Sequence, residues 1–269
     1  MILRPALASL LVTLTLLGAA LGQSFPLEVP RPLGGPIVGP NGKIMTGLDQ
    51  PVSPWTGGVE FGLNGNDGNV QIFKVFAGAN LKFETPENLL LINGLYIYTH
   101  HEDQVIEQKA LLTLRDEVPF ADLWAYYAQG QLEYDEFRPV KFRLAAHNGL
   151  SFTVIRDGSM LLKARAGLGT AREFDGPQPS REWVPEAQFG GDFEYRFTER
   201  TTLTTAFDYY PDLYDFDHYR IRARVSLDFL IDPDLNLVLR IGAMERYDSK
   251  SFGYRRSDLD YFTSLMFRF

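Results

Sequence analysis

From Trp55 to the C-terminus, hydrophobic and polar residues alternate one by one along much of the chain. The clearest run is residues 218–231, where six apolar residues alternate with three arginines, a serine and an aspartate. Successive side chains of a β-strand point to opposite faces of the sheet, so this run predicts a strand with one apolar and one charged face. The same alternation recurs at residues 71–83, 140–146, 161–170 and 186–197.

About twelve such segments follow one another, most of them roughly 10 to 16 residues long. Strands of soluble proteins usually have about 5 or 6 residues, whereas a strand that crosses a membrane needs about 9 to 11. The links between segments alternate in length. Tight links are expected at residues 85–88, 118–120, 156–159, 198–201 and 231–234, and longer ones at 135–139, 174–185, 211–217 and 247–258. Short turns at one end and longer loops at the other are typical of outer-membrane barrels.

We therefore predict an all-β fold, a closed antiparallel transmembrane β-barrel of about 12 strands with short periplasmic turns and longer extracellular loops. Inside a bilayer every backbone polar group needs a partner, so a sheet must close on itself. One face then meets lipid and the other a lumen, which explains the alternation. A soluble β-sandwich or calycin-like barrel, with an apolar core and a charged outer face, is the alternative that alternation alone leaves open.

Aromatic residues make up 13% of the chain, and 45% of the residues are hydrophobic. Tyr and Trp suit the headgroup region of a bilayer because an apolar ring carries a polar tip. We expect such a belt near the strand ends, formed by Trp55, Tyr96, Tyr98, Trp124, Tyr126, Tyr127, Tyr209, Tyr210, Tyr247 and Tyr261. The unremarkable hydrophobic content is then an average over two opposite surfaces.

The N-terminus predicts export. Residues 1–22 combine Arg4, an apolar run over residues 7–21 and small residues before Gln23, which is the pattern of a cleaved signal peptide. An uncleaved anchor is the alternative, but the run is short for a membrane span. Residues 23–53 are rich in Pro and Gly and predict a periplasmic linker, with a plug or a partner-docking segment as alternatives. The barrel is expected over residues 54–269.

Charge adds candidate chemistry for the lumen. The net charge of −8 argues against a nucleic-acid partner, which would need clustered Lys and Arg. If the apolar faces meet lipid, the opposite faces line the lumen. The charges expected there are Glu60, Lys74, Lys82, Lys141, Arg143, Lys163, Arg165, Asp192, Glu194, Arg196, Asp208, Arg220, Arg222, Arg224, Asp228 and Arg240.

These lumen charges allow two interpretations. They can neutralise one another and stabilise the wall, or they can form a weakly anion-selective pore near Arg220, Arg222, Arg224 and Arg240. A barrel of about twelve strands is wide enough for either. A symmetric hairpin around residues 211–217 would place Asp208 near Arg220.

No catalytic residue, cofactor or metal is predicted. Residues 100–103 (His-His-Glu-Asp) fall at an expected loop, but adjacent strand residues point apart and rarely chelate one ion together. The one close His/Asn/Ser grouping is His147, Asn148 and Ser151. His147 and Ser151 have lumen parity, whereas an outer-membrane phospholipase needs these groups on the lipid-facing side. There is no phosphate-binding loop, dinucleotide fingerprint or zinc spacing.

The last strand resembles a known assembly signal. Residues 261–269 end on Phe, with Leu265, Phe267 and Phe269 at one parity, as in the C-terminal strand read by the outer-membrane barrel assembly machinery. The resemblance implies that this machinery is a partner of the chain.

Residues 55–269 also resemble the family of salt-induced outer-membrane proteins. The matching motifs are Trp55-Thr56-Gly57-Gly58, Gly65-Asn66-Asp67-Gly68-Asn69, Gly167-Leu168-Gly169, and Asp260 with Phe267-Arg268-Phe269. The resemblance implies a barrel in the outer membrane and a link to salt stress, and it transfers no catalytic residue.

We therefore expect an exported protein of the bacterial outer membrane that acts as a small passive channel for ions or small solutes. A structural or anchoring barrel without an open pore is the main alternative, and a phospholipase-like enzyme is less favoured. The expected partners are the lipid bilayer, the assembly machinery and small solutes in the lumen.

Overall fold

The computed structural model describes residues 37–38, 44–45, 53–66, 71–175, 182–250 and 253–269. The expected signal peptide and most of the expected linker lie outside these residues. Within the linker, strands β1 (Ile37–Val38) and β2 (Ile44–Met45) pair in antiparallel fashion. In the described part of the chain, no helix is long and apolar enough to cross a membrane.

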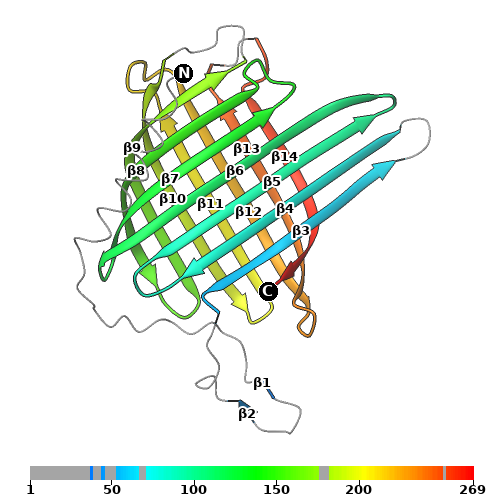
Figure 1. The fold of residues 1–269 in the computed structure, drawn as a ribbon. Helices are drawn as coiled ribbons and strands as arrows, with labels where there is room; N and C mark the ends of the chain where they lie inside the picture. Colours follow the sequence, from blue (N-terminus) through cyan, green and yellow to red (C-terminus); the bar gives the residue numbers. More distant parts are fainter. Residues whose placement is uncertain (1–36, 39–43, 46–52, 67–70, 176–181, 251–252) are drawn as a thin grey trace. The chain divides into compact units, whose positions relative to one another are not determined.

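Twelve antiparallel strands, β3 to β14, close into a barrel in chain order (Figure 1). They are β3 (Trp55–Asn66), β4 (Ile72–Glu84), β5 (Leu89–His101), β6 (Gln104–Ala121), β7 (Trp124–Asp135), β8 (Phe142–Arg156), β9 (Met160–Phe174), β10 (Val184–Thr198), β11 (Thr201–Pro211), β12 (Tyr219–Asp232), β13 (Leu237–Asp248) and β14 (Ser257–Arg268). The predicted closed antiparallel barrel of about 12 strands is confirmed.

One end of the barrel, the turn end, carries the short links 85–88, 122–123, 157–159, 199–200 and 233–236, together with the start of β3 and the end of β14. Asp157 shows how such a turn is held, because its Oδ1 accepts bonds from the backbone N–H of Ser159 at 2.8 Å and of Met160 at 2.7 Å. These bonds favour the charged carboxylate and lower the pKa of Asp157.

The other end, the loop end, carries the links 67–71, 102–103, 136–141, 175–183, 212–218 and 249–256. Two expected positions were wrong. The turn expected at residues 118–120 lies at 122–123, because β6 continues through Pro119 with a register shift before Ala121. The loop expected at residues 100–103 is a two-residue turn, and His100 and His101 still belong to β5.

The strands place apolar side chains outside and polar ones inside. In β14, Tyr261 and Leu265 are 73% and 49% exposed, whereas Asp260 and Ser264 are 7% and 2% exposed. Large exposed apolar residues recur on the outward positions of the other strands. This is the reverse of the soluble alternative, which needs its apolar face inside, and that alternative is therefore wrong.

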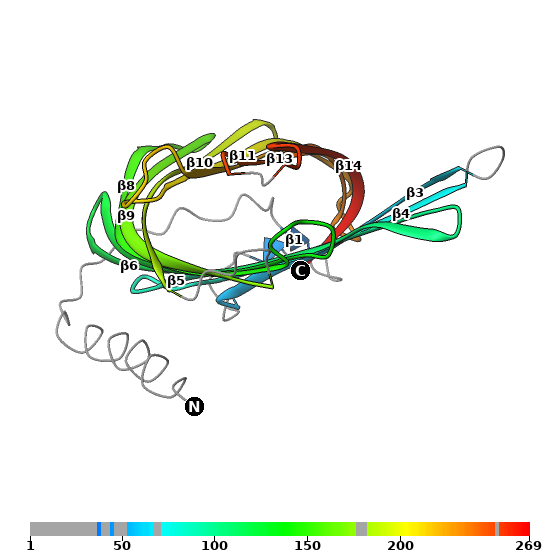
Figure 2. The same cartoon turned by 90° about the horizontal axis from the view of Figure 1, so that it is seen from above.

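The barrel closes through a short seam. Residues 58–61 of β3 pair with residues 265–268 of β14, and Gly57 and Phe269 exchange backbone hydrogen bonds of 2.9 and 3.0 Å. Every other ladder of the barrel has between nine and fourteen pairs. Figure 2 shows the ring flattened and the β3–β4 hairpin projecting from it beside β14. The seam therefore has fewer ladder pairs than any other junction of the barrel.

A cysteine pair across the seam should lock the barrel. Phe61 and Leu265 are directly opposite, and the native chain has no cysteine, so F61C/L265C should form a disulfide under a mild oxidant. We expect the oxidised variant to lose the mobility change on heating in SDS, and a reductant to restore it. Non-reducing gel electrophoresis of the membrane fraction measures both.

The matched control is G65C/Y261C, which extends the same register by four residues beyond the last pair of the seam. It should stay largely reduced. Equal cross-linking of the two variants would show that the ladder continues past residue 61 and would contradict a short seam.

Candidate functional site: the barrel interior

Ion pairs cross the barrel interior between strands that are not neighbours. Arg224 of β12 donates to Glu60 of β3 at 2.9 Å, and Lys163 of β9 donates to Glu117 of β6 at 2.7 Å. Two other strands separate the members of each pair in the barrel order. The alternate residues of the strands therefore point into a shared interior, where opposite walls touch.

The packed cluster, defined as Tyr127, Arg165, Gln188, Asp208 and Tyr210, joins β7, β9, β10 and β11. The Arg165 side chain is fully buried and donates to Asp208 at 3.2 Å. Gln188 also donates to Asp208, at 3.0 Å, and accepts a bond from the Tyr127 hydroxyl at 3.0 Å. Tyr210 accepts a bond from Gln129 at 3.3 Å. Four strands are thereby tied together by buried polar bonds.

Tyr127 and Tyr210 correct the predicted aromatic belt. Both were expected at the lipid headgroups, but they point inward and are 0% and 2% exposed. Their neighbours in the chain, Tyr126 and Tyr209, have the opposite parity and point outward. In these tyrosine pairs, only one ring can belong to an outer belt because adjacent strand residues face opposite sides.

Glycines make room for the packed cluster. A Cβ at Gly190 would lie 2.2 Å from Asp208 Oδ1, and a Cβ at Gly167 would lie 2.4 Å from the Tyr127 hydroxyl. A Cβ at Gly169 would meet the ring of His147 at 2.5 Å. The Gly167-Leu168-Gly169 motif therefore has a packing reason, since side chains from other strands occupy the space beside it.

An apolar cluster fills the part of the interior near the seam. Phe76 of β4, Ile97 of β5, Met244 of β13 and Phe262 of β14 are all buried and pack together. The rings of Phe76 and Phe262 stack with centroids 4.6 Å apart. Because β4 and β5 lie on the other side of the seam from β13 and β14, this contact also joins opposite walls.

Arginines and acids continue the network towards the turn end of β14. Glu60 Oε2 accepts bonds from Arg240 at 3.2 Å and from Ser264 at 3.0 Å. Asp228 accepts from Arg240 at 2.7 Å and from Arg268 at 2.6 Å. Each acid thus serves more than one donor.

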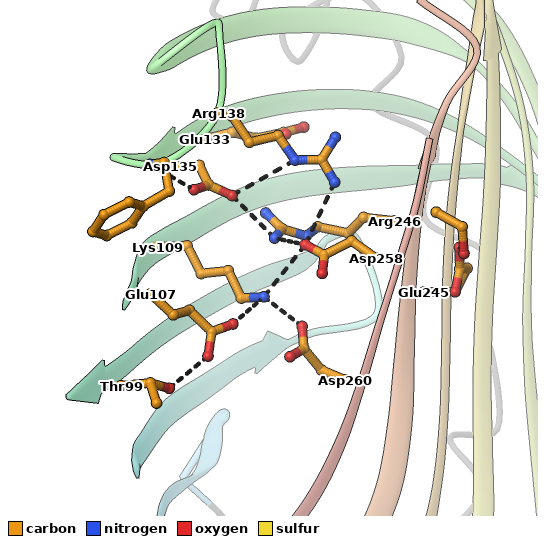
Figure 3. Close-up of polar contacts among 12 residues, drawn as sticks. Thr99, Glu107, Lys109, Glu133, Asp135, Arg138, Glu245, Arg246, Asp258 and Asp260 are labelled. Atoms are coloured by element: carbon orange, nitrogen blue, oxygen red, sulfur yellow. Dashed lines mark hydrogen bonds and ion pairs between the residues drawn. The ribbon is translucent and has the colours of Figure 1, made fainter. Parts of the chain in front are cut away.

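A second charged group lies towards the loop end (Figure 3). Lys109 is buried and its ammonium contacts Glu107 and, at 2.5 Å, Asp260. Arg246 contacts Asp258, the next inward residue of β14. Figure 3 shows these side chains converging from β5–β7 on one wall and from β13–β14 on the other.

Further round the loop end, Arg143 donates to Glu186 at 2.5 Å and to Glu133 at 3.4 Å. Glu133 also contacts Arg222 from across the barrel. His147 is buried, and its Nε2 lies 3.3 Å from Glu186. One wall therefore presents acids to arginines from both neighbouring and distant strands.

The charges predicted for the lumen all take part in ion pairs. They are Glu60, Lys74, Lys82, Lys141, Arg143, Lys163, Arg165, Asp192, Glu194, Arg196, Asp208, Arg220, Arg222, Arg224, Asp228 and Arg240. Lys141 lies in the link before β8 and pairs with Glu136 of the same link. Glu194 and Arg196 lie 3.9 Å apart near the turn end of β10.

The expected proximity of Asp208 and Arg220 is wrong. In the ladder Asp208 is opposite Arg222, and Arg220 is opposite Tyr210. The hairpin loop is closed by the bond from Asp212 N–H to the His218 carbonyl at 2.9 Å. The centre of this loop is therefore one residue later in the chain than the centre of a loop over residues 211–217. Each residue of β11 consequently pairs with a β12 residue two positions later than expected.

Several inward residues were not found from the sequence. Lys109, Arg115 and Glu117 alternate along β6 with outward Ala110, Leu112 and Leu114, so the signal was present. Residues 89–98 are apolar on both faces, and only the structure shows that Ile97 points inward while Tyr96 is 37% exposed outside.

The His147, Asn148 and Ser151 grouping is divided between the two faces of β8. No group of three or more metal-binding side chains gathers among the residues that the structure describes. His147 and Ser151 are both buried, at 2% exposure each, on the inward face. Asn148 points the other way and accepts a bond from Tyr126 at 3.1 Å.

Three solved structures illustrate what the chain is similar to. The NanC porin is 9% identical with a TM-score of 0.45, covering 79% of this chain and 97% of its own. The KdgM porin is 10% identical with a TM-score of 0.39, covering 80% and 99%. The outer-membrane channel DcaP of Acinetobacter baumannii is 9% identical with a TM-score of 0.37, covering 80% and 95%. No curated protein matches the chain.

A protein-family match covers residues 59–269, which is the whole barrel except its first few residues. The family is described as proteins of unknown function, DUF481. Because the match spans well over half of the sequence, the chain belongs to the DUF481 family.

Proposed function

We propose that this protein spans the bacterial outer membrane as a barrel whose lumen is closed at rest by its own side chains. The outer surface supports the membrane placement, because apolar residues occupy its outward positions while the interior is charged. The closed ring supports it further, since eleven of its twelve junctions are long ladders and a spanning sheet must pair its backbone groups.

The closed lumen is argued from one observation, namely that side chains of strands far apart in the barrel order meet inside it, as Glu133 of β7 and Arg222 of β12 do. The packed cluster fills the interior between β7 and β11, and the apolar cluster fills it between β4, β5, β13 and β14. A solute that passed through would have to displace buried, hydrogen-bonded groups. This favours a structural or anchoring barrel over an open pore.

The ion pairs give this closed interior its stability. Removing one member of a buried pair leaves an uncompensated charge and typically costs about 3–5 kcal/mol. Arg165, which is fully buried and shared between Asp192 and Asp208, is the clearest case. A narrow channel that opens when these groups separate is the second candidate, favoured by the basic hollow at the loop end described below.

We further propose that residues 1–22 are a cleaved signal peptide and that residues 23–53 form a periplasmic linker. The strand containing Leu265, Phe267 and Phe269 would be read by the assembly machinery. Their outward positions beside the seam support this role, because the ladder that closes the barrel forms there last in the chain order. The link to salt stress stays a prediction.

Emptying the packed cluster should open the barrel. In planar bilayers we expect no discrete conductance from the native protein and discrete conductance steps from Y127A/Y210A, because both rings fill the interior. Each loss of a buried aromatic ring costs about 3–5 kcal/mol, so folding is checked first by the heat-dependent gel shift.

Y126A/Y209A is the matched control, since the neighbouring rings point outward, and it should behave as the native protein. Large steady currents from the native protein would refute the closed state. If folded Y127A/Y210A showed no conductance, the proposal that the packed cluster closes the lumen would be refuted.

Outer-membrane placement and the C-terminal signal can be tested together. The native protein should fractionate with the outer membrane and show a heat-dependent gel shift.

The F269S variant should reach the outer membrane in several-fold lower amount. The same variant refolded in detergent should keep the gel shift, because the backbone bonds to Gly57 remain available. Recovery of the native protein in the soluble periplasm would overturn the placement. If refolded F269S lacked the gel shift, Phe269 would be needed for the stability of the barrel and not for recognition by the assembly machinery.

A further inference from the structure

A hollow at the loop end of the barrel is lined mainly by basic residues. Its free space, including the open mouth and the solvent within it, is about 620 Å³. Seven of its lining residues are Lys or Arg and three are Asp or Glu. It is thus far more basic than the chain as a whole, whose net charge is −8.

Two arginines of the hollow are neighbours of like charge. Arg222 of β12 and Arg246 of β13 are directly opposite in the ladder, and both line the hollow. Like charges at directly opposite positions destabilise a sheet. A negative charge between the two guanidinium groups would therefore stabilise this arrangement.

The acids that contact these arginines are each shared with other cations, although Arg246 also contacts Asp135 at 3.1 Å and Arg143 also contacts Glu186. Glu133 serves both Arg222 and Arg143. Asp258 serves Arg246, together with Arg138 at 3.4 Å and Lys109 at 3.5 Å. Each of these carboxylates therefore divides its charge among two or three cations.

Unused donors provide a second, independent observation. Arg143 lines the hollow, its side chain is 3% exposed, and its buried Nε has no hydrogen-bond partner within the described residues. The buried Nε of Arg246 is in the same state. Buried N–H donors are normally satisfied, and the guanidinium fork suits oxyanions, to which it can donate two parallel bonds.

We propose that this hollow binds a small oxyanion that carries two or more negative charges, such as phosphate or a polycarboxylate. Arg143, Arg222 and Arg246 are the binding residues. The anion occupies the space beside the opposed arginines and accepts bonds from their guanidinium N–H groups. This site is independent of the proposed closed lumen, because an anion can bind at the loop end without passing through the barrel.

Isothermal titration calorimetry on the full-length barrel in neutral detergent tests the site, with inorganic phosphate as the probe and sodium chloride adjusted to constant ionic strength. We expect saturable binding at one site per barrel. R222Q and R246Q should each weaken it at least tenfold, and R222K should weaken it less than R222Q because the charge stays while the fork is lost.

R196Q is the matched control, because Arg196 lies near the turn end, outside the hollow, and should leave the affinity unchanged. Y127A should also still bind phosphate, so a failure of the closed-barrel proposal remains separate from a failure of this one. The heat-dependent gel shift verifies that each variant is folded.

Three outcomes would overturn the site. They are the absence of saturable binding to the folded native protein, equal weakening by R196Q and R222Q, and binding only to micelles that contain phosphatidic acid. The last outcome would assign the arginines to a lipid headgroup rather than to a free anion.

Discussion

The whole structure depends on one constraint, that no backbone N–H or C=O may face lipid without a hydrogen-bond partner. Twelve strands close through residues 57–61 and 265–269, while residues 62–66 of β3 and 257–264 of β14 have no ladder partner across the seam. The seam is short because β3 leaves the ring with β4 soon after Phe61. A Cβ at Gly62 would lie 2.4 Å from the Thr263 carbonyl oxygen, so a glycine is needed where the two strands still touch.

Closure in turn determines the interior. A ring of twelve strands encloses more space than a ring of eight. Figure 2 shows this ring flattened, and side chains of non-neighbouring strands meet inside it. Charges taken out of water there need partners, and the arginines find carboxylates on distant strands. Gly167 and Gly190 leave space for inward side chains, because a Cβ at either position would overlap a side chain of another strand.

Sequence alternation predicted the strands, the closed barrel and the direction of most charges, because parity is a local property. It did not predict which charges meet, since Arg115 and Asp192 are brought together by the flattening and not by any ladder. Parity also separates Tyr126 from Tyr127, but expecting both in one belt ignored it. The position of Asp208 depended on the centre of a loop, where an error of one residue displaces a whole ladder.

The balance of charge along the interior argues for anion binding at the mouth without passage beyond it. Around the packed cluster three cations face three acids, namely Arg115, Lys163 and Arg165 with Glu117, Asp192 and Asp208. An anion that reached this group would lose its hydration and meet carboxylates whose arginines are already taken. In the loop-end hollow the same anion meets two opposed arginines at an open mouth whose lining holds seven Lys and Arg residues and three acids. The same kind of residue therefore stabilises the wall inside the barrel and lines a basic hollow at its loop end.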